Sequence, residues 1–233
     1  MDTEQFFEQL DTRIAKYDLL CHPFYKAWSP GQLTREDLRE YAADYYPHVA
    51  AFPEHLAALA ARTTDGEQRC AILANRADEL GSDGGPAHDE LWLDFAEGMG
   101  AEREQVRRRQ PLPEVAELVA TLRRIAEEGT PAAALAAFYA YESQVPRVAQ
   151  VKARGLREMY GADARSCAYF TLHQAADVEH AKVWKTQLER ERAADWGGAG
   201  VEEQALGAAE TTARLLWRAL DGIERARQAR PAA

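Results

Sequence analysis

The side chains of His173, Asp177 and His180 have the types and the spacing of a metal site. Each residue of an α-helix advances by roughly 100°, so Asp177 lies about 40° from His173 around the axis and His180 about 20° to the other side. All three would leave a helix in one direction. Two imidazoles and a carboxylate form the mixed nitrogen and oxygen set that suits iron, manganese or zinc. The alternative is a solvated polar stripe, on which His and Asp are ordinary residues.

Glu142 is the first charged residue after the apolar run 131–141, whose helix should lie in the core. A buried carboxylate without a partner is costly. We therefore expect Glu142 to pair with a base such as Arg147, to be protonated and hydrogen-bonded, or to bind a metal.

Glu79 and His88 flank the segment 81–86, Gly-Ser-Asp-Gly-Gly-Pro, which strongly predicts a loop. From this position both side chains could reach into a helical bundle, although both are also common surface residues at helix ends. Bundle cores build two-metal sites from carboxylates and histidines on separate helices. Such a set is available here in Glu79, His88, Glu142, His173, Asp177 and His180.

Aromatic residues gather on two early segments and again beside Glu142. Most should belong to the core, but a tyrosine close to an oxygen-activating metal pair can be oxidised, so one of them could be a radical carrier or a reactant. Lys152 lies about 80° from Glu142 around an ideal helix, and this position predicts a surface lysine. The aromatic set is Tyr25, Trp28, Tyr41, Tyr45, Tyr46, Phe52, Phe138, Tyr139 and Tyr141.

The elements that must position these residues are predicted to be helices throughout. Apolar residues recur at helical spacing, and no segment rich in valine, isoleucine or threonine competes as a strand. The fold is therefore expected to be all-α. Turn and capping signals predict helices over 3–19, 22–28, 34–62 with bends at Pro47 and Pro53, 66–80, from about 88, 113–128, 131–160 with a bend near Pro146, 163–194 and 201–228.

The whole chain, 1–233, is expected to form one domain, because no Gly-, Pro- or Ser-rich linker interrupts it and 46% of its residues are apolar. A formal charge of −10 disfavours nucleic acid as a partner. The longest charge-free apolar run is shorter than the roughly 20 residues that a membrane span needs, and the N-terminus lacks a secretory pattern. We expect a cytoplasmic protein with no membrane partner.

Five motifs spread along the chain carry a family resemblance: His22-Pro-Phe-Tyr25-x-x-Trp28, Tyr45-Tyr-Pro-His-Val-Ala-Ala-Phe-Pro53, His88-x-x-Leu-Trp92, Tyr139-Ala-Tyr-Glu-Ser-Gln-Val-Pro146 and His173-x-x-x-Asp-x-x-His180. Over nearly its whole length the chain resembles the Chlamydia protein associating with death domains and its bacterial relatives, within the haem-oxygenase-like di-metal oxidases. The resemblance implies a seven-helix haem-oxygenase-like bundle of the TenA and PqqC type, without haem and often a homodimer.

The resemblance also implies roles for individual residues. The family's metal ligands fall on the six residues grouped above, and would hold Fe/Fe, Mn/Fe or Mn/Mn, with dioxygen and a reductant as co-substrates and a reductase or small molecule supplying the electrons. Such proteins are associated with making p-aminobenzoate for folate from their own tyrosine. On this match Tyr25 is the sacrificed tyrosine, Lys152 the amino donor and Tyr141 a further catalytic residue.

The chain departs from the family after Glu79, where relatives tend to carry a second glutamate and this chain has Leu80. Asp78 or Asp83 is therefore an alternative ligand.

Three other functions stay open on the same scaffold. A conventional oxidase would act on a separate fatty acid or amino acid, and a cofactor-ring oxidase would need no metal. A thiaminase-like enzyme would need a nucleophilic cysteine, whereas the three cysteines lie outside all five motifs. The non-enzymatic alternative is a protein-interaction module.

Overall fold

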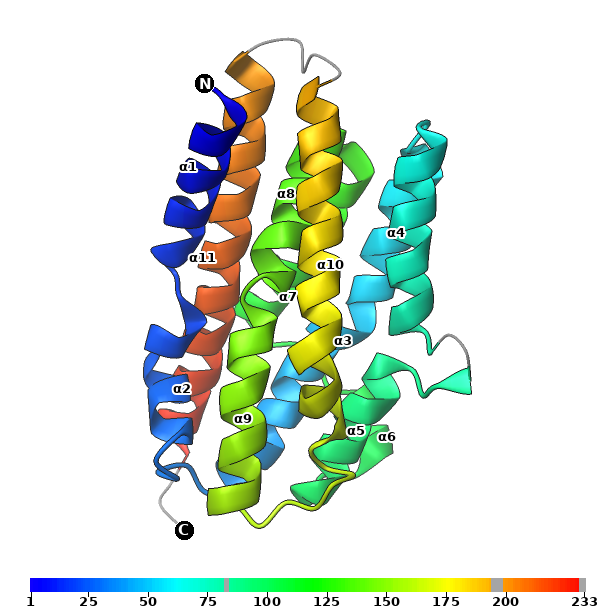
Figure 1. Cartoon of the computed structure of the whole chain (residues 1–233). Helices are drawn as coiled ribbons and strands as arrows, with labels where there is room; N and C mark the ends of the chain where they lie inside the picture. The colour runs from blue at the N-terminus through cyan, green and yellow to red at the C-terminus, as the bar shows by residue number, and fades with distance from the viewer. Residues whose placement is uncertain (82–83, 194–198, 231–233) are drawn as a thin grey trace.

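The computed structural model describes residues 1–81, 84–193 and 199–230, and in these ranges every regular element is helical. The all-α prediction is therefore confirmed. Figure 1 shows long helices running side by side along one axis, with the short helices α2, α5 and α6 near one end. In chain order the elements are α1 (Thr3–Ala15), η1 (Leu19–Cys21), α2 (Pro23–Trp28), α3 (Arg35–Arg62), α4 (Gly66–Glu79), α5 (His88–Gly98), α6 (Arg103–Arg107), α7 (Pro113–Glu128), α8 (Pro131–Glu142), α9 (Val145–Met159), α10 (Ala168–Ala193) and α11 (Ala199–Ala229).

Local sequence signals explain where most of these helices begin. Thr34 caps α3 in a reciprocal capping box with Asp37, which satisfies two backbone N–H groups that the first turn leaves free. Thr130 caps α8 by accepting the Ala133 N–H, with Pro131 at the first helical position. Pro47 lies inside α3, which nevertheless continues to Arg62.

The continuous helix predicted over 131–160 is wrong, because the structure divides it into α8 and α9. Pro146 has no N–H to donate to the Glu142 carbonyl oxygen, and its ring clashes with that carbonyl if one helix continues through it. The chain turns at Ser143 and Gln144 instead, and the Gln144 side chain accepts the Leu19 N–H at 3.1 Å. Glu142 is consequently the last residue of α8.

Smaller differences occur at three other places. The first helix ends at Ala15, and Asp18 then caps η1 by accepting the Leu20 N–H. The start of α10 is at Ala168, after a turn in which Asp163 accepts hydrogen bonds from Ser166. Helix α6 was not predicted.

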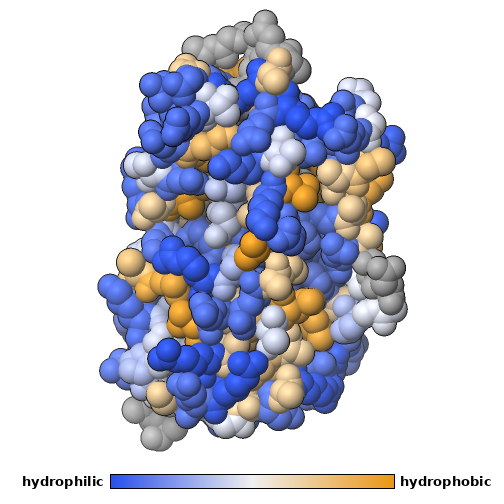
Figure 2. Space-filling model, in the orientation of Figure 1, coloured by the Kyte–Doolittle hydropathy of each residue, from blue (hydrophilic) through white to orange (hydrophobic). Residues whose placement is uncertain are grey.

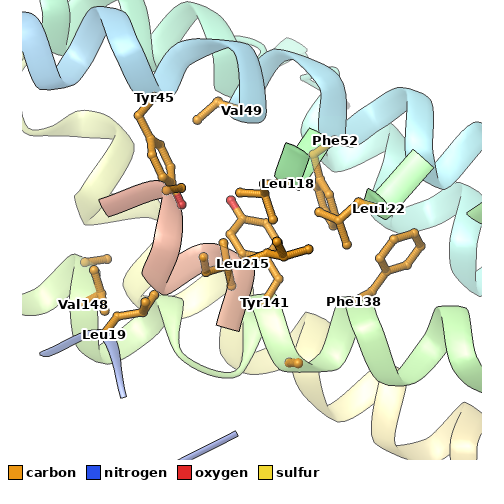
Figure 3. Close-up of a cluster of buried hydrophobic side chains, with 14 of the residues drawn as sticks. Leu19, Tyr45, Val49, Phe52, Leu118, Leu122, Phe138, Tyr141, Val148 and Leu215 are labelled. Carbon is orange, nitrogen blue, oxygen red and sulfur yellow. The ribbon is translucent and has the colours of Figure 1, made fainter. Parts of the chain in front are cut away.

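The core is built around α8, which is buried on nearly all sides and packs between α10, α11 and α7. Its alanines permit close approach of these neighbours. Figure 3 shows part of this core, where Phe52 from α3 lies among Leu122 from α7 and the α8 aromatics Phe138 and Tyr141.

The surface in Figure 2 is mostly hydrophilic, with apolar residues in small groups. Across the described part of the chain, every helix is too short or too polar to span a membrane.

Candidate metal centre and tyrosine pocket

The six predicted ligands converge from four helices. Glu79 ends α4, His88 begins α5, Glu142 ends α8, and the remaining three lie on α10. Their exposed fractions are only 1–6%. A solvated stripe on α10 is therefore excluded. Glu79 and His88 are buried as well, so the surface position that the sequence alone favoured for these two residues is wrong.

The ligand atoms form two groups that share one residue. Glu79 lies with His88 and His173 in one group and with Glu142 and His180 in the other, and within each group the atoms lie within 4.8 Å of one another. Asp177 adjoins the second group, since its Oδ1 lies 3.3 Å from His180 Nδ1. Two such groups could hold two metals, and the Glu79 carboxylate would be available to both.

The imidazoles are oriented by partners outside the centre. His173 Nδ1 lies 2.7 Å from the Tyr169 carbonyl oxygen, which leaves Nε2 for the centre. His180 Nδ1 faces the carboxylates of Glu142 and Asp177, while its Nε2 lies 3.3 Å from Asp78 Oδ2. Metal-binding histidines usually have their second ring nitrogen held by such an oxygen.

Asp78 thus contacts the outer side of a predicted ligand, whereas Glu79 belongs to both groups. Of the two alternative acids, Asp83 lies outside the described residues. Sequence reasoning considered Asp78 only as a replacement for Glu79, because a one-residue offset at a helix end does not show which side chain points inward.

Glu142 is held by two donors that the sequence did not suggest. Asn75 Nδ2 lies 3.2 and 3.3 Å from the two carboxylate oxygens, and Trp184 Nε1 donates to Oε2. The pairing with Arg147 is wrong, because Arg147 is exposed and contacts Asp18 at 2.9 Å. These contacts leave the other face of Glu142 directed at His180.

The electrostatics of the centre favour a bound cation. Burial raises the pKa of Asp177 to about 8. Burial alone would lower the pKa of His180, but the carboxylates of Asp177 and Glu142, each 3.3 Å from Nδ1, raise it. A proton on His180 thus supplies the positive charge that stabilises these carboxylates. Divalent metals bound at the centre would supply that charge instead of the proton. Burial lowers the pKa of His173 to about 3, so that its imidazole is neutral and can be a ligand.

Buried polar atoms that lack a hydrogen bond also fit a metal ion at this centre. His88 Nδ1, His180 Nδ1 and Asp177 Oδ1 are buried and make no hydrogen bond of good geometry. Buried polar atoms in this state are rare and often mark an ion site. A set of three histidines and three carboxylates fits iron or manganese.

A second cluster lies beside the centre, around Tyr25. The Tyr25 hydroxyl lies 2.7 Å from Lys152 Nζ and 3.1 Å from the Tyr41 hydroxyl, and Lys152 Nζ also donates to Tyr41. Lys152 is only 4% exposed, so the prediction of a surface lysine is wrong. That prediction assumed one continuous helix, whereas the break after Glu142 turns the lysine-bearing face of α9 inward.

The surroundings of Lys152 favour the uncharged form of its amine. Burial lowers its pKa well below the usual value, and the groups that contact its amine are phenols rather than carboxylates. Six aromatic rings, including those of Tyr25, Trp28 and Tyr41, lie within 6 Å of Nζ. A neutral amine keeps a lone pair and can act as a nucleophile.

Tyr169 connects the two clusters. Its ring stacks on His173 with centroids 4.0 Å apart, and it borders a cavity of about 30 Å³ that Tyr25, Tyr141 and Lys152 also line. Burial raises the pKa of Tyr169, and the neighbouring Tyr141 partly offsets this by lowering it. Tyr169 was missed in the sequence, although it precedes His173 by four residues and therefore shares its helix face.

Asp78→Asn is expected to weaken metal binding about 10- to 100-fold at the group containing His180, because the amide holds the imidazole less well. Chelator competition on the purified protein measures this affinity. Glu179→Gln is the matched control, since Glu179 is exposed on α10, the helix of His180, and pairs with Lys182. Equal affinities for the Asp78 and Glu179 variants would show that Asp78 does not position His180.

Fold and site together define a class: an all-helical bundle with a buried centre of histidines and carboxylates, suited to redox-active metals. The chain belongs to the family described as iron-containing redox enzyme, whose model matches residues 39–220. The matched range contains all six predicted ligands and Lys152, whereas Tyr25 precedes it.

Individual relatives extend the similarity. A 4-aminobenzoate synthase of Chlamydia pneumoniae is 42% identical over 184 residues, which cover 79% of this chain and 81% of the relative. A 4-aminobenzoate synthase of Nitrosomonas europaea is 39% identical over 235 residues, covering 96% and 92% of the two chains. These matches confirm the family resemblance.

A solved structure confirms the haem-oxygenase-like fold. It comes from Shewanella denitrificans, is described as a domain of unknown function with that fold, and superposes with a TM-score of 0.80 at 20% identity. The match covers 98% of this chain and 94% of the other.

Proposed function

We propose that the protein makes p-aminobenzoate from its own Tyr25, with Lys152 as the amino donor and a two-metal centre as the source of oxidising power. One observation carries the proposal: the Lys152 amine lies 2.7 Å from the Tyr25 hydroxyl, inside a closed aromatic pocket. In p-aminobenzoate the nitrogen occupies the ring position that the hydroxyl occupies in tyrosine. The amine therefore lies where the nitrogen must enter. The 4-aminobenzoate synthases of Chlamydia pneumoniae and Nitrosomonas europaea support the same product.

The metals would be held by the two groups that share Glu79, with Asp177 beside the second. Fe/Fe, Mn/Fe and Mn/Mn all suit this donor set. When bound, they supply the activation of dioxygen with electrons from a reductant.

The chain's own residues orient and deprotonate the reactants. Lys152 is held neutral by burial, and Tyr41 fixes both its amine and the Tyr25 hydroxyl. Tyr141 and Tyr169 lie between the pocket and the centre, and burial raises the pKa of both well above 10. Either phenol therefore loses its proton only together with an electron, which suits a carrier of oxidising equivalents.

An oxidase with a separate substrate is the second candidate, and its substrate would have to bind outside the tyrosine pocket, for example in the hollow of about 400 Å³ that borders His88 and His180. The cavity of about 30 Å³ in the tyrosine pocket is large enough for a water molecule. A fatty acid or an aromatic amino acid would need several times this volume, whereas the Tyr25 ring is already in place.

Intact mass spectrometry tests the proposal. Metal-loaded protein given dioxygen and a reductant should lose the mass of the tyrosine side chain together with the Lys152 nitrogen while p-aminobenzoate appears, and Tyr25→Phe should reduce the product to background. Tyr139→Phe is the control, because that hydroxyl contacts Asp11 on the outer side of α8. Product formed by a chain of unchanged mass would instead demonstrate a separate substrate.

The proposal also covers the location, the assembly and the electron donor of the protein. We propose a cytoplasmic homodimer that takes electrons from a reductase or a small-molecule reductant, with neither nucleic acid nor membrane as a partner. The net charge of −10 and three free cysteines support this setting.

A further inference from the structure

We propose that loss of the Tyr25 side chain opens a binding site for a free para-substituted phenol, such as p-cresol, which is that side chain as a separate molecule. The inference rests on the proposed function only in one respect, since turnover is what would empty the pocket in the native chain. That turnover would also take the Lys152 nitrogen, so the spent chain would keep the Tyr41 hydroxyl as the polar group of the pocket. The pocket itself is defined by the structure.

The walls of the pocket should stay in place when the ring is removed. Tyr25 is 3% exposed, and Trp28 and Tyr41 meet its ring edge-on with centroids 6.4 and 6.3 Å away. Both neighbours are fully buried and contact further rings, among them Phe95. Close-packed surroundings of this kind relax only partly around a deleted side chain, and apolar cavities formed by such deletions bind free aromatic molecules.

One end of the vacated space is polar. Lys152 Nζ and the Tyr41 hydroxyl both lose a hydrogen-bond partner when Tyr25 is removed. A buried polar group without a partner is costly, and a ligand hydroxyl at this position would restore the lost contacts. The site should therefore prefer a phenol to a hydrocarbon of the same shape.

The existing cavity adjoins the position of the ring. Leu19 of η1 and Val145 and Val148 of α9 line it on the side away from the metal centre, and Val145 is half-buried. Figure 3 shows Leu19 and Val148 next to each other at the end of the cluster where Tyr45 lies. On this side the cavity is bordered by η1, which is a single turn of helix.

Tyr25→Gly removes the Tyr25 side chain while keeping Lys152 and provides the test. Calorimetry with the purified variant should detect one p-cresol per chain, bound about tenfold or more tightly than toluene. The wild type should bind neither, because Tyr25 fills the site. In Tyr25→Gly combined with Lys152→Met, the advantage of p-cresol over toluene should be smaller, because only the Tyr41 hydroxyl is left to pair with the ligand.

Two outcomes would overturn the inference: equal binding of p-cresol by the wild type and Tyr25→Gly, or equal affinity of Tyr25→Gly for p-cresol and toluene. Tyr25→Ala replaces the glycine variant if the latter does not fold. If neither folds alone, p-cresol should restore folding where toluene does not, and failure to do so counts against the site. None of these measurements requires turnover, so they are independent of the mass test of the proposed function.

Discussion

Glu79→Gln is expected to cost the protein both metals rather than one. Its carboxylate is the only residue shared by the two ligand groups found among the described residues, and an amide cannot bridge two cations in the way a carboxylate does. Loss of a residue that merely orients a ligand costs 10- to 100-fold in affinity or activity, so we expect loss of this ligand to lower p-aminobenzoate formation at least about a hundredfold.

Metal analysis after dialysis measures the effect directly. His88→Ala provides the comparison, because His88 belongs to one group and should affect one metal more than the other. Glu179→Gln is the surface control and should keep full occupancy. A Glu79 variant that kept one tightly bound metal would contradict the shared position.

The spacing of residues in the sequence was sufficient to predict part of the metal centre. The α10 residues lie on one helix face, which follows from helix geometry alone. Glu142 was recognisable as a buried carboxylate from the apolar run before it, and the structure buries it. What spacing could not show is that Glu79 lies between the two groups, because this depends on how α4 and α5 pack on α10.

The tyrosine pocket was less predictable than the metal centre. Tyr25 and Lys152 were assigned roles by resemblance, whereas position on an ideal helix placed Lys152 at the surface. The break between α8 and α9 changes that position, and it arises from Pro146 together with the side chain of Gln144, which contacts Leu19 in η1. A contact over this sequence separation is a property of the folded chain and has no local signal.

Lys152→Met is expected to abolish p-aminobenzoate formation while leaving the protein folded. Methionine matches the length of the lysine stem and fills the aromatic pocket, but it has no nitrogen to transfer. Protein labelled with ¹⁵N-lysine should yield labelled product from the wild type. Lys182→Met is the control, because Lys182 is exposed and pairs with Glu179. Product from the Lys152 variant would show that the nitrogen comes from elsewhere.

Lys152→Met is also expected to change how the unfolding free energy depends on pH. The pKa of Lys152 is depressed in the folded chain by burial, whereas in the unfolded chain it is about 10.4. Between these two values unfolding takes up a proton, so the unfolding free energy of the wild type rises with pH, by up to about 1.4 kcal/mol per pH unit. Lys152→Met lacks this proton uptake, and its advantage over the wild type should shrink as pH rises from about 8 to about 10.

Denaturant unfolding of both proteins across this range separates the chemical role of Lys152 from its structural cost. A neutral, buried amine destabilises the fold, and the methionine variant should therefore be the more stable protein at neutral pH while being the inactive one. If the unfolding free energies of the two proteins changed with pH in parallel, Lys152 would be charged in the folded chain. A charged amine has no lone pair to offer, so that result would also remove Lys152 as the amino donor.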